Sequence, residues 1–534
     1  MVFRVMNCCL VYPRNKSITS YDKPAWRAEH LGLSYVAEAI RRAGHNVDVI
    51  NAAADDLDAD KVVRKLVAGN YDFCGFSPTC LTIRDTLDIA EIVRHKLPHT
   101  HISLGGHHAT HCALKIMQNH NSINSVVRGY ADASIVKLLS AIERKDDGCR
   151  VKGIYYRNQD GCTIQNDDLL LSEIPFPKYY PKPSSICRSE HSYVIHSSRG
   201  CYNHCSFCST PRFGAIHGLQ SWLGRNAEDI VDEIEFICES DNSGRVVEIS
   251  ILDDNFIPAT REGRERARQI AKNIISRNLK VDIWAMLSAR AIVSCDDELL
   301  TLLYQAGLRR VLFGVEAGEN ETLITYRKPS TRDENLQALN LLLKFSLSVH
   351  ATSILFHPYA NMEEIRNNAD FIEKIHSLPG VCSYTPICSR LLVFPGTSIY
   401  DRLLQDGMVD EGECYLNPYA YTFKDHSVAW LADHMRSLEA KIAPLYWLLT
   451  DINNYFAIYN IDPNSHYMHR ISITMKKARS ICYEYFIESA GIAYKSDGRS
   501  AFPRTEQFID ILMDTITDLS NAYSELQLSY TKQI

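Results

Sequence analysis

The stretch SYVIHSSRGCYNHCSFCST, residues 192–210, joins an apolar run to a loop that contains Cys201, Cys205 and Cys208. The apolar run predicts a buried β-strand, so the loop begins at the carboxyl end of that strand. In parallel α/β structures this is the end where ligands bind and chemistry takes place. The spacing Cys-x3-Cys-x2-Cys lets three thiolates converge on one metal centre. The stretch therefore predicts a parallel α/β architecture with a metal site.

Three explanations of these cysteines compete. The chain has 17 cysteines, so a chance grouping of free thiols is one. A structural zinc site is the second, and it needs a fourth ligand, for which His204, Cys187 and His196 are the nearby candidates. The third is an iron–sulfur cluster held by cysteine thiolates. We favour the cluster, because three ligands on a four-iron cube leave one iron open for a cofactor or substrate.

The rhythm of strand and helix continues through residues 191–400. Apolar runs predict strands at 192–200, 246–254, 280–289, 309–318, 348–358 and 389–396, and helical patterns such as 226–240, 260–278 and 331–346 lie between them. Six β/α units predict a full or partial (β/α)6 barrel, with its reactive end at the carboxyl ends of the strands.

Residues 1–140 show a similar alternation. Strands are predicted at 3–13, 46–52, 71–79, 101–108 and 124–130, and helices at 31–45, 59–69 and 84–98. This pattern predicts a doubly wound, flavodoxin/Rossmann-like domain. The carboxyl ends of its strands carry small or polar residues, namely Ser77, Thr79, Gly105, Gly106 and Gly129.

The remaining segments complete a four-part organisation of 1–140, 141–190, 191–400 and 401–534. Residues 151–166 predict a hairpin around Asp160-Gly161, and the proline-rich stretch 173–185 predicts a linker. Residues 401–534 have helical periodicity, strongest at 428–456 and 505–527, and predict a helical C-terminal domain.

Composition narrows the class of protein. The 534 residues are 46% hydrophobic and carry a net charge of −7, so nothing predicts a nucleic-acid partner. No apolar run is long enough to predict a membrane span. The N-terminal residues resemble a first strand more than a signal peptide, and scattered cysteines, odd in number, predict a reducing compartment. We therefore expect a cytoplasmic protein.

The segment RGCYNHCSFC, residues 199–208, resembles the motif of radical S-adenosylmethionine (SAM) enzymes, Cys-x3-Cys-x-aromatic-Cys, with Phe207 as the aromatic residue. The resemblance implies a 4Fe-4S cluster on Cys201, Cys205 and Cys208, and SAM on its open iron. It implies a 5′-deoxyadenosyl radical that removes a hydrogen atom from a small-molecule substrate. It also implies an electron donor such as flavodoxin or ferredoxin.

Other strand ends resemble the same family in LDDNF (252–256), SAR (288–290), FGVEAGEN (313–320) and FPGTS (394–398). The resemblance implies SAM contacts for Phe207, Asp254, Ser288, Arg290 and Glu316. Helix caps or ion pairs within the barrel are the alternative for the polar members of this set. At residues 357–358 a His-Pro pair replaces the family's glycine-rich turn near adenine, so His357 faces the substrate or is a satisfied barrel-end histidine.

The N-terminal residues resemble the cobalamin-binding domain of B12-dependent radical SAM enzymes in HLGLSYVAEAIRRAGHNVDVI (30–50), FCGFSPTCLT (73–82), SLGGHHAT (103–110) and VVRGYADAS (126–134). This implies contacts with cobalamin for Ser77, Thr79, Gly105, Gly106, His107 and Gly129, with His108 and Thr110 beside them. No Asp-x-His-x-x-Gly follows the first strand, which implies base-off cobalamin without a histidine on cobalt. GYADAS departs from the more usual Gly-Glu-Gly-Glu, and flavodoxin-like folds bind many ligands.

The combined resemblance implies C-methylation of an unactivated carbon in a small-molecule or natural-product substrate, through a 5′-deoxyadenosyl radical and methylcobalamin. Radical cyclisation, ring contraction or rearrangement with the same cofactors is the alternative. A non-catalytic corrinoid sensor is a third hypothesis. We expect the C-terminal helices to shape the substrate pocket.

Overall fold

The computed structural model describes residues 4–14, 30–146, 151–158, 160–170, 192–219, 222–241, 244–383, 386–459, 461, 466–496, 502 and 504–531. The predicted linker 173–185 and Cys187 lie outside the described residues. The chain divides into two compact units, residues 1–254 with 393–420 and residues 255–392 with 421–534. Each is described by itself.

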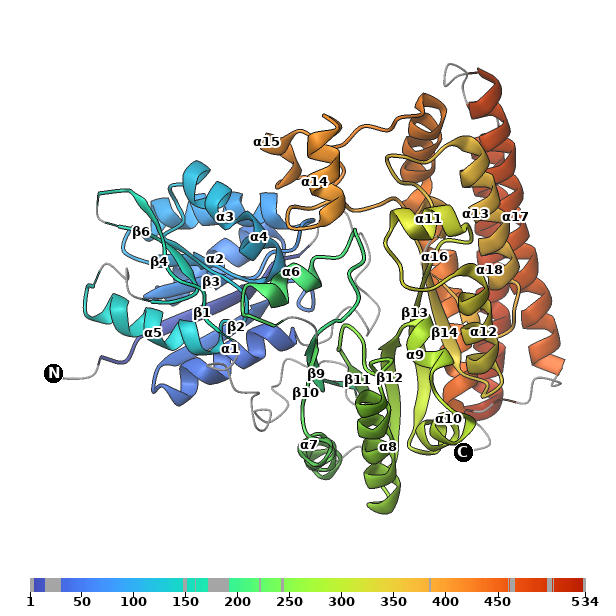
Figure 1. Cartoon of the computed structure of the whole chain (residues 1–534), viewed down its shortest axis with the longest axis horizontal. Helices are drawn as coiled ribbons and strands as arrows, with labels where there is room; N and C mark the ends of the chain where they lie inside the picture. The colour runs from blue at the N-terminus through green and yellow to red at the C-terminus, as the bar shows by residue number, and fades with distance from the viewer. Residues whose placement is uncertain are drawn as a thin grey trace. The chain divides into compact units, whose positions relative to one another are not determined.

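The first unit contains a seven-stranded sheet in the order β2-β1-β3-β4-β5-β6-β7 (Figure 1). The first five strands are parallel, and their order 2-1-3-4-5 is that of flavodoxin-like domains. The predicted doubly wound domain is confirmed. The strands are β1 (Asn7–Tyr12), β2 (Asn46–Asn51), β3 (Phe73–Phe76), β4 (His101–Leu104), β5 (Ser125–Val127), β6 (Ile154–Arg157) and β7 (Thr163–Gln165).

Helices cover both faces of this sheet. One apolar core packs α1 and α5 against it, and a second packs α2, α3 and α4 against the other face. The predicted hairpin at 151–166 is confirmed as β6–β7, and it extends the sheet by antiparallel pairing with β5. The helices are α1 (Leu31–Arg42), α2 (Ala59–Gly69), α3 (Ile83–Lys96), α4 (Gly106–Asn119) and α5 (Asp132–Glu143).

The cysteine stretch also belongs to the first unit. The single strand predicted over 192–200 is wrong, because the chain bends at residues 196–197 between β8 (Ser192–Ile195) and β9 (Ser198–Gly200). β8 pairs in parallel with β11, whereas β9 pairs antiparallel with β10. The other elements here are α6 (Thr210–Ala215), β10 (Trp222–Gly224), α7 (Ala227–Ser240), β11 (Val247–Ile251), α14 (Ser398–Gln405) and α15 (Glu411–Cys414).

The second unit contains a run of parallel strands in chain order, β12-β13-β14-β15. Helices alternate with them, as the sequence predicts, and side-chain caps such as Thr260 and Thr331 begin two of these helices. The elements are α8 (Arg261–Ser276), β12 (Val281–Leu287), α9 (Ala289–Val293), α10 (Asp297–Gln305), β13 (Leu308–Glu316), α11 (Asn320–Thr325), α12 (Arg332–Leu343), β14 (Ser348–Ser353), α13 (Met362–His376), β15 (Val381–Cys382) and the 3₁₀ turn η3 (Pro386–Cys388).

The strand predicted at 389–396 is wrong. Arg390 makes only an isolated parallel bridge with Phe356, and no strand follows it up to Gly396. Pro395 has no N–H to donate, and Gly396 turns the chain with φ +89° into the N-cap of α14. The last of the parallel strands is instead the short β15, which pairs with β14.

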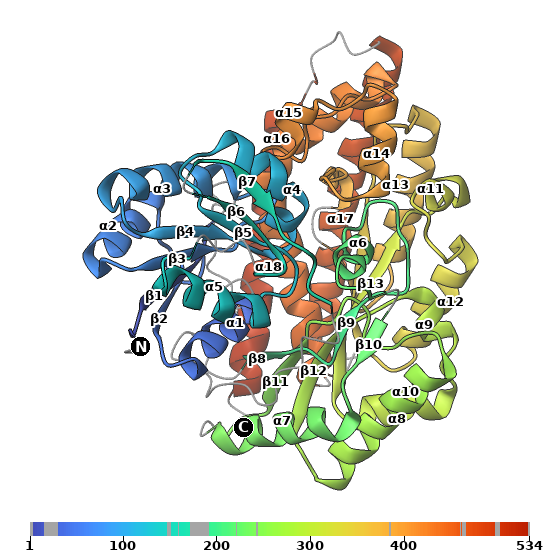
Figure 2. The same ribbon diagram turned by 60° about the vertical axis from the view of Figure 1, so that its left-hand side comes forward.

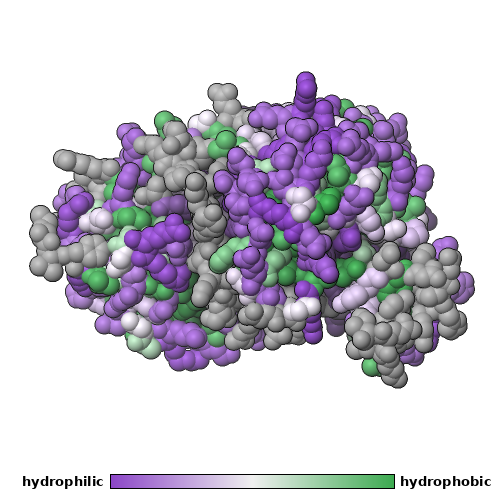
Figure 3. Space-filling view, turned by 90° about the horizontal axis from the view of Figure 1, so that it is seen from below, coloured by the Kyte–Doolittle hydropathy of each residue, from purple (hydrophilic) through white to green (hydrophobic). Residues whose placement is uncertain are grey.

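Three long helices confirm the predicted helical C-terminus. They are α16 (His426–Tyr459), α17 (His466–Ser496) and α18 (Thr505–Thr531), and in Figures 1 and 2 they run beside one another. α16 also packs on β13, β14 and β15 within the same unit. Among the described residues, every helix is too short or too polar to cross a lipid bilayer. Hydrophilic residues predominate on the face shown in Figure 3, where hydrophobic ones occur in small groups.

Candidate cofactor sites

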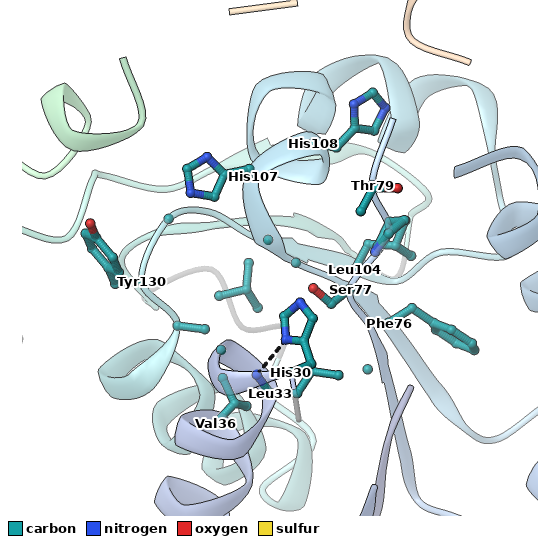
Figure 4. A pocket seen from close by; sticks show the side chains of 18 of the residues that line it. His30, Leu33, Val36, Phe76, Ser77, Thr79, Leu104, His107, His108 and Tyr130 are labelled. Atoms are coloured by element: carbon teal, nitrogen blue, oxygen red, sulfur yellow. Dashed lines mark hydrogen bonds between the residues drawn. The ribbon is translucent and has the colours of Figure 1, made fainter. Parts of the chain in front are cut away.

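A cavity of about 590 Å³ lies at the carboxyl ends of β1, β3, β4 and β5 in the first unit. Its walls include the N-terminal ends of α1, α4 and α5, as Figure 4 shows. Side chains that flank the cysteine loop, namely His196, Arg199, Ser209 and Phe213, also line it. The cavity therefore brings the cysteine loop and the doubly wound domain to one space.

Glycines keep the wall of this cavity thin. A Cβ on Gly75 of β3 would meet Leu10 Cδ2 at 2.9 Å, and one on Gly106 would meet Ser77 Oγ at 2.9 Å. Gly106 also has φ +85°, which L side chains adopt at a cost. Ser77, Thr79, Gly105, Gly106, His107 and Gly129, the predicted cobalamin residues, all line the cavity. An elongated group that must approach the backbone closely, such as the nucleotide tail of a corrinoid, fits this wall.

The polar residues at the carboxyl ends of these strands form hydrogen bonds with one another. The Thr110 hydroxyl donates to Gly106 O at 2.7 Å and accepts from Gly129 N–H at 2.9 Å. Thr79 N–H donates to Thr82 Oγ1 at 2.8 Å. Gly129 is required by a protein neighbour, because a Cβ there would lie 1.7 Å from His217 Nε2. These bonds shape the edge before any ligand is bound.

His107 and His108 follow the Gly-Gly pair but differ in role. The His107 ring stacks on Phe213 of α6, with ring centroids 3.7 Å apart and planes 6° from parallel. His108 instead bonds through Nε2 to Tyr415 O at 2.7 Å. Burial lowers the pKa of both rings to about 4, so both are neutral at pH 7. Both rings line the cavity, but Nε2 of His108 is already bonded to the protein, whereas His107 has no hydrogen-bond partner among the described residues.

The cysteine loop is anchored at its start by Asp253. This carboxylate, 1% exposed, accepts the backbone N–H groups of Ser197 and Ser198 at 2.7 and 3.0 Å and their hydroxyls at 2.5 and 2.6 Å. Further along, Ser206 O accepts the N–H of Ile399 at 2.9 Å, which ties the loop to FPGTS. The bend between β8 and β9 follows from these bonds.

Cys201, Cys205 and Cys208 are partly exposed on one loop. Cys208 N–H donates to Cys205 O at 3.1 Å and closes a turn between two of them. Within the described residues, no three His, Cys, Asp or Glu side chains converge on a single ion. His204 is exposed and His196 lines the cavity, which does not support the zinc alternative. Three separated thiols on a loop suit a multi-iron cluster, which is larger than one ion.

The predicted SAM residues of the first unit lie beside this loop. Asp254 accepts from Thr210 Oγ1 at 2.9 Å, and burial raises the pKa of its carboxyl group to about 6. Phe207 is partly buried. A carboxyl group with a raised pKa near a reactive loop is a candidate for contact with a cationic ligand.

Ser288, Arg290 and Glu316 lie in the second unit. Ser288 caps α9, and Arg290 is 4.0 Å from Glu334. Glu316 accepts from Lys328 Nζ at 3.3 Å and from Thr352 Oγ1 at 3.2 Å. Its φ of +64° at the end of β13 is unusual for a non-glycine residue, and such conformations occur at functional sites. Each of the three therefore already has a protein partner.

His357 is a satisfied histidine. It is 1% exposed and its Nε2 bonds to Glu364 Oε1 at 2.8 Å. The substrate-facing alternative for His357 is not supported.

Comparisons with known proteins agree with this geometry. Residues 24–139 match the B12 binding domain, and residues 195–372 match the radical SAM superfamily. The chain belongs to the radical SAM enzymes that carry a B12-binding domain.

Curated relatives of this radical SAM enzyme differ in reaction. An uncharacterised methyltransferase of Pyrococcus horikoshii is 25% identical over 382 residues, covering 70% of this chain and 79% of the relative. The hopanoid C-3 methylase of Methylococcus capsulatus is 26% identical over 386 residues, covering 71% and 69%. The anaerobic magnesium-protoporphyrin IX monomethyl ester cyclase of Synechocystis is 25% identical over 363 residues, covering 65% and 67%.

Two solved structures share the fold. The cobalamin-dependent SAM radical enzyme OxsB, with aqua-cobalamin and SAM bound, superposes with a TM-score of 0.70 at 15% identity, over 99% of this chain and 81% of OxsB. The radical SAM methyltransferase TsrM of Kitasatospora setae, with cobalamin and its 4Fe-4S cluster, gives 0.63 at 14% identity, over 92% and 100%. The radical SAM domain implies SAM and a 4Fe-4S cluster, and the B12-binding domain implies cobalamin.

Sequence reasoning missed several residues of this radical SAM enzyme. Asp253 is one of them, because nothing local distinguishes it from its neighbour Asp254 and its partners Ser197 and Ser198 lie more than fifty positions away in the sequence. Phe213 and His217 lie just beyond the cysteine motif and contact the B12-binding domain. No local pattern announces such long-range contacts.

Proposed function

We propose that this enzyme is a cobalamin-dependent C-methyltransferase that acts on an unactivated carbon of a small-molecule or natural-product substrate. One observation carries the proposal. A single cavity is lined by the Gly105–Gly106 turn of the B12-binding domain and by Arg199, Ser209 and Phe213, which flank the cysteine loop. A corrinoid in that cavity would lie beside the cluster loop.

The residues divide into three sets. Cys201, Cys205 and Cys208 would hold the cluster; Phe207, Asp254, Ser288, Arg290 and Glu316 would hold SAM; and Ser77, Thr79, Gly105, Gly106, His107 and Gly129 would hold cobalamin. When bound, the cluster and SAM supply a 5′-deoxyadenosyl radical and cobalamin supplies a methyl group. The chain positions the loop through Asp253 and keeps the cavity wall apolar through Leu10, Val36 and Ile135.

Methyl transfer is supported by the methyltransferases among the relatives. Cobalamin would bind base-off without a histidine on cobalt, because the segment after β1 lacks Asp-x-His-x-x-Gly. The proposal includes a flavodoxin- or ferredoxin-type electron donor and a cytoplasmic location. The 15 cysteines in the described part of the chain form no disulfide bond with one another, which supports a reducing compartment.

The test needs no substrate. The full chain is reconstituted anaerobically with iron, sulfide and hydroxocobalamin, then given a strong reductant and SAM. Mass spectrometry quantifies S-adenosylhomocysteine and 5′-deoxyadenosine. Both products, with S-adenosylhomocysteine dependent on cobalamin, are expected.

Radical cyclisation or rearrangement is the second candidate, favoured by the cyclase among the relatives. 5′-Deoxyadenosine without S-adenosylhomocysteine would point to it and reject methyl transfer. If neither product forms on an intact cluster, the sensor hypothesis is the one to test.

A further inference from the structure

His30 occupies the N-cap of α1, at the cavity and close to the end of β1. Its Nδ1 lies 3.1 Å from the Leu33 backbone N–H, which it shares with the His30 carbonyl oxygen at 2.9 Å. A side chain that accepts from the third helical N–H is a helix cap. Histidine is an unusual choice for this position, so a second role is worth seeking.

The cap bond fixes the tautomer of the ring. Because Nδ1 faces an N–H donor, Nδ1 is the nitrogen without a proton, and the neutral ring carries its proton on Nε2. Burial lowers the pKa of His30 to about 4, so the ring is neutral at pH 7. A histidine that binds a metal through Nε2 has the opposite arrangement, with Nδ1–H donating to an acceptor. His30 in this state is a donor and not a metal ligand.

The Nε2–H group points into the cavity, as Figure 4 shows. Within the described part of the chain it has no hydrogen-bond partner, although the ring is held firmly. The Tyr12 ring lies 4.4 Å away between centroids. A Cβ on Gly32 would approach His30 Cε1 to 3.3 Å, so glycine there leaves room for the ring. A fixed donor that faces a cavity without a partner is suited to a ligand acceptor.

We propose that His30 binds cobalamin as a hydrogen-bond donor, through Nε2–H to a carbonyl or phosphate oxygen of the corrinoid, and does not ligate cobalt. This inference rests on the cobalamin site of the proposed function. It assigns one side chain two tasks, since the ring caps α1 with one nitrogen and binds the ligand with the other.

The test separates these tasks with three variants of the full chain. His30→Asn keeps an acceptor, Oδ1, in place of Nδ1 to cap α1, but its shorter side chain has no donor at the position of Nε2. His30→Ala loses both the cap and the donor. Asp58→Ala is the matched control, because Asp58 caps α2 through Lys61 N–H at 2.8 Å and does not line the cavity. Binding of hydroxocobalamin is measured by absorbance titration, and helix stability by urea unfolding.

We expect His30→Asn to weaken cobalamin binding about 3- to 10-fold, the effect of one hydrogen bond, with little loss of stability. His30→Ala weakens binding similarly and also lowers stability, and Asp58→Ala lowers stability alone. Equal cobalamin affinity in His30→Asn and the parent chain would overturn the inference and leave the site intact. No cobalamin binding by the parent chain would overturn the proposed cobalamin site as well.

Electron paramagnetic resonance of the Co(II) form tests the second half of the inference. Nitrogen superhyperfine splitting that is present in the parent chain and disappears in His30→Asn would make His30 a cobalt ligand and reject the donor role. Splitting that persists in His30→Asn would come from another nitrogen. It would contradict the base-off state of cobalamin but not the donor role of His30. Absence of splitting in both, with weaker binding by His30→Asn, is the expected result.

Discussion

The two proposed cofactor surfaces differ in how much of their polar surface the protein already uses. On the cobalamin side, His30 Nε2 and the ring edge of His107 face a cavity and have no hydrogen-bond partner among the described residues. At the strand ends of the second unit, Glu316 has Lys328 and Thr352, and Arg290 has Glu334. The first surface is formed in advance for its ligand, whereas the second must exchange a protein contact for a ligand contact.

The largest effect of a substitution is expected at the cysteine loop, which lies in the sequence between the residues of these two surfaces. Cys205→Ala should abolish 5′-deoxyadenosine formation, because two thiolates do not retain a cluster with one open iron. Iron and sulfide content after reconstitution should fall to background while cobalamin binding persists. Cys162→Ala, on the exposed hairpin, is the control and should keep both. Retention of the cluster by Cys205→Ala would show that another ligand serves.

Asp253→Ala tests whether protein contacts hold the cysteine loop in its conformation before a ligand binds, as they do for the cavity. Removing this acceptor leaves two backbone N–H groups and two hydroxyls buried without a partner. We expect a loss of about 4 kcal/mol in the free energy of unfolding in urea, and faster loss of iron from the reconstituted protein. Asp253→Asn keeps one oxygen for the N–H groups and should lose about half as much. If both variants matched the parent chain, the loop would be held by other contacts.

Lys328→Met tests the strand ends of the second unit, where the polar side chains already have protein partners. Both side chains of the Lys328–Glu316 pair are about 10% exposed or less, so Glu316 would be left as a buried charge. We expect a loss of about 3 kcal/mol in unfolding free energy and weaker SAM binding by equilibrium dialysis. Lys328→Arg should recover much of both. Unchanged SAM affinity in Lys328→Met, at a lower stability, would give the pair a structural role only.

The sequence predicts features that depend on neighbouring residues better than features that depend on contacts between residues far apart in the chain. The cysteine motif, the Gly-Gly turn and the strand–helix rhythm are local, so the doubly wound sheet and the helices of 226–346 agree with prediction. The strand predicted at 101–108 is too long, because β4 ends at Leu104 and α4 begins at Gly106. The bend at residues 196–197 depends on Asp253, more than fifty positions away in sequence, and the pattern of apolar residues cannot report it. His30 opens the segment 30–50 that resembles a cobalamin-binding domain, but its position at the cavity could not be predicted, because four separate strands build that cavity.

Acid should destabilise both units through their buried histidines. Burial lowers the pKa of His101 in the first unit and of His376 in the second to about 3, so both remain neutral when folded. The unfolded chain takes up their protons below pH 6.5, so stability is complete above pH 6.5 and is lost as pH falls toward 3. At pH 5 each contributes a loss of at most about 2 kcal/mol. His101→Gln and His376→Gln should each flatten the fall of the urea midpoint between pH 7 and pH 5, and an unchanged slope would contradict the assigned pKa.

The smallest effect expected is also the sharpest test of the preformed cavity. Gly106 and Gly161 have φ values of +85° and +79°, so alanine costs about 1 kcal/mol of stability at either position. The surroundings differ, since a Cβ on Gly106 meets Ser77 Oγ at 2.9 Å, whereas one on Gly161 meets nothing within 4 Å. Gly106→Ala should therefore bind hydroxocobalamin about tenfold more weakly, and Gly161→Ala should bind it as the parent chain does. Equal affinities would mean that the cavity wall moves to accommodate its ligand. The cavity would then not be formed in advance, and it would no longer differ in this respect from the strand ends of the second unit.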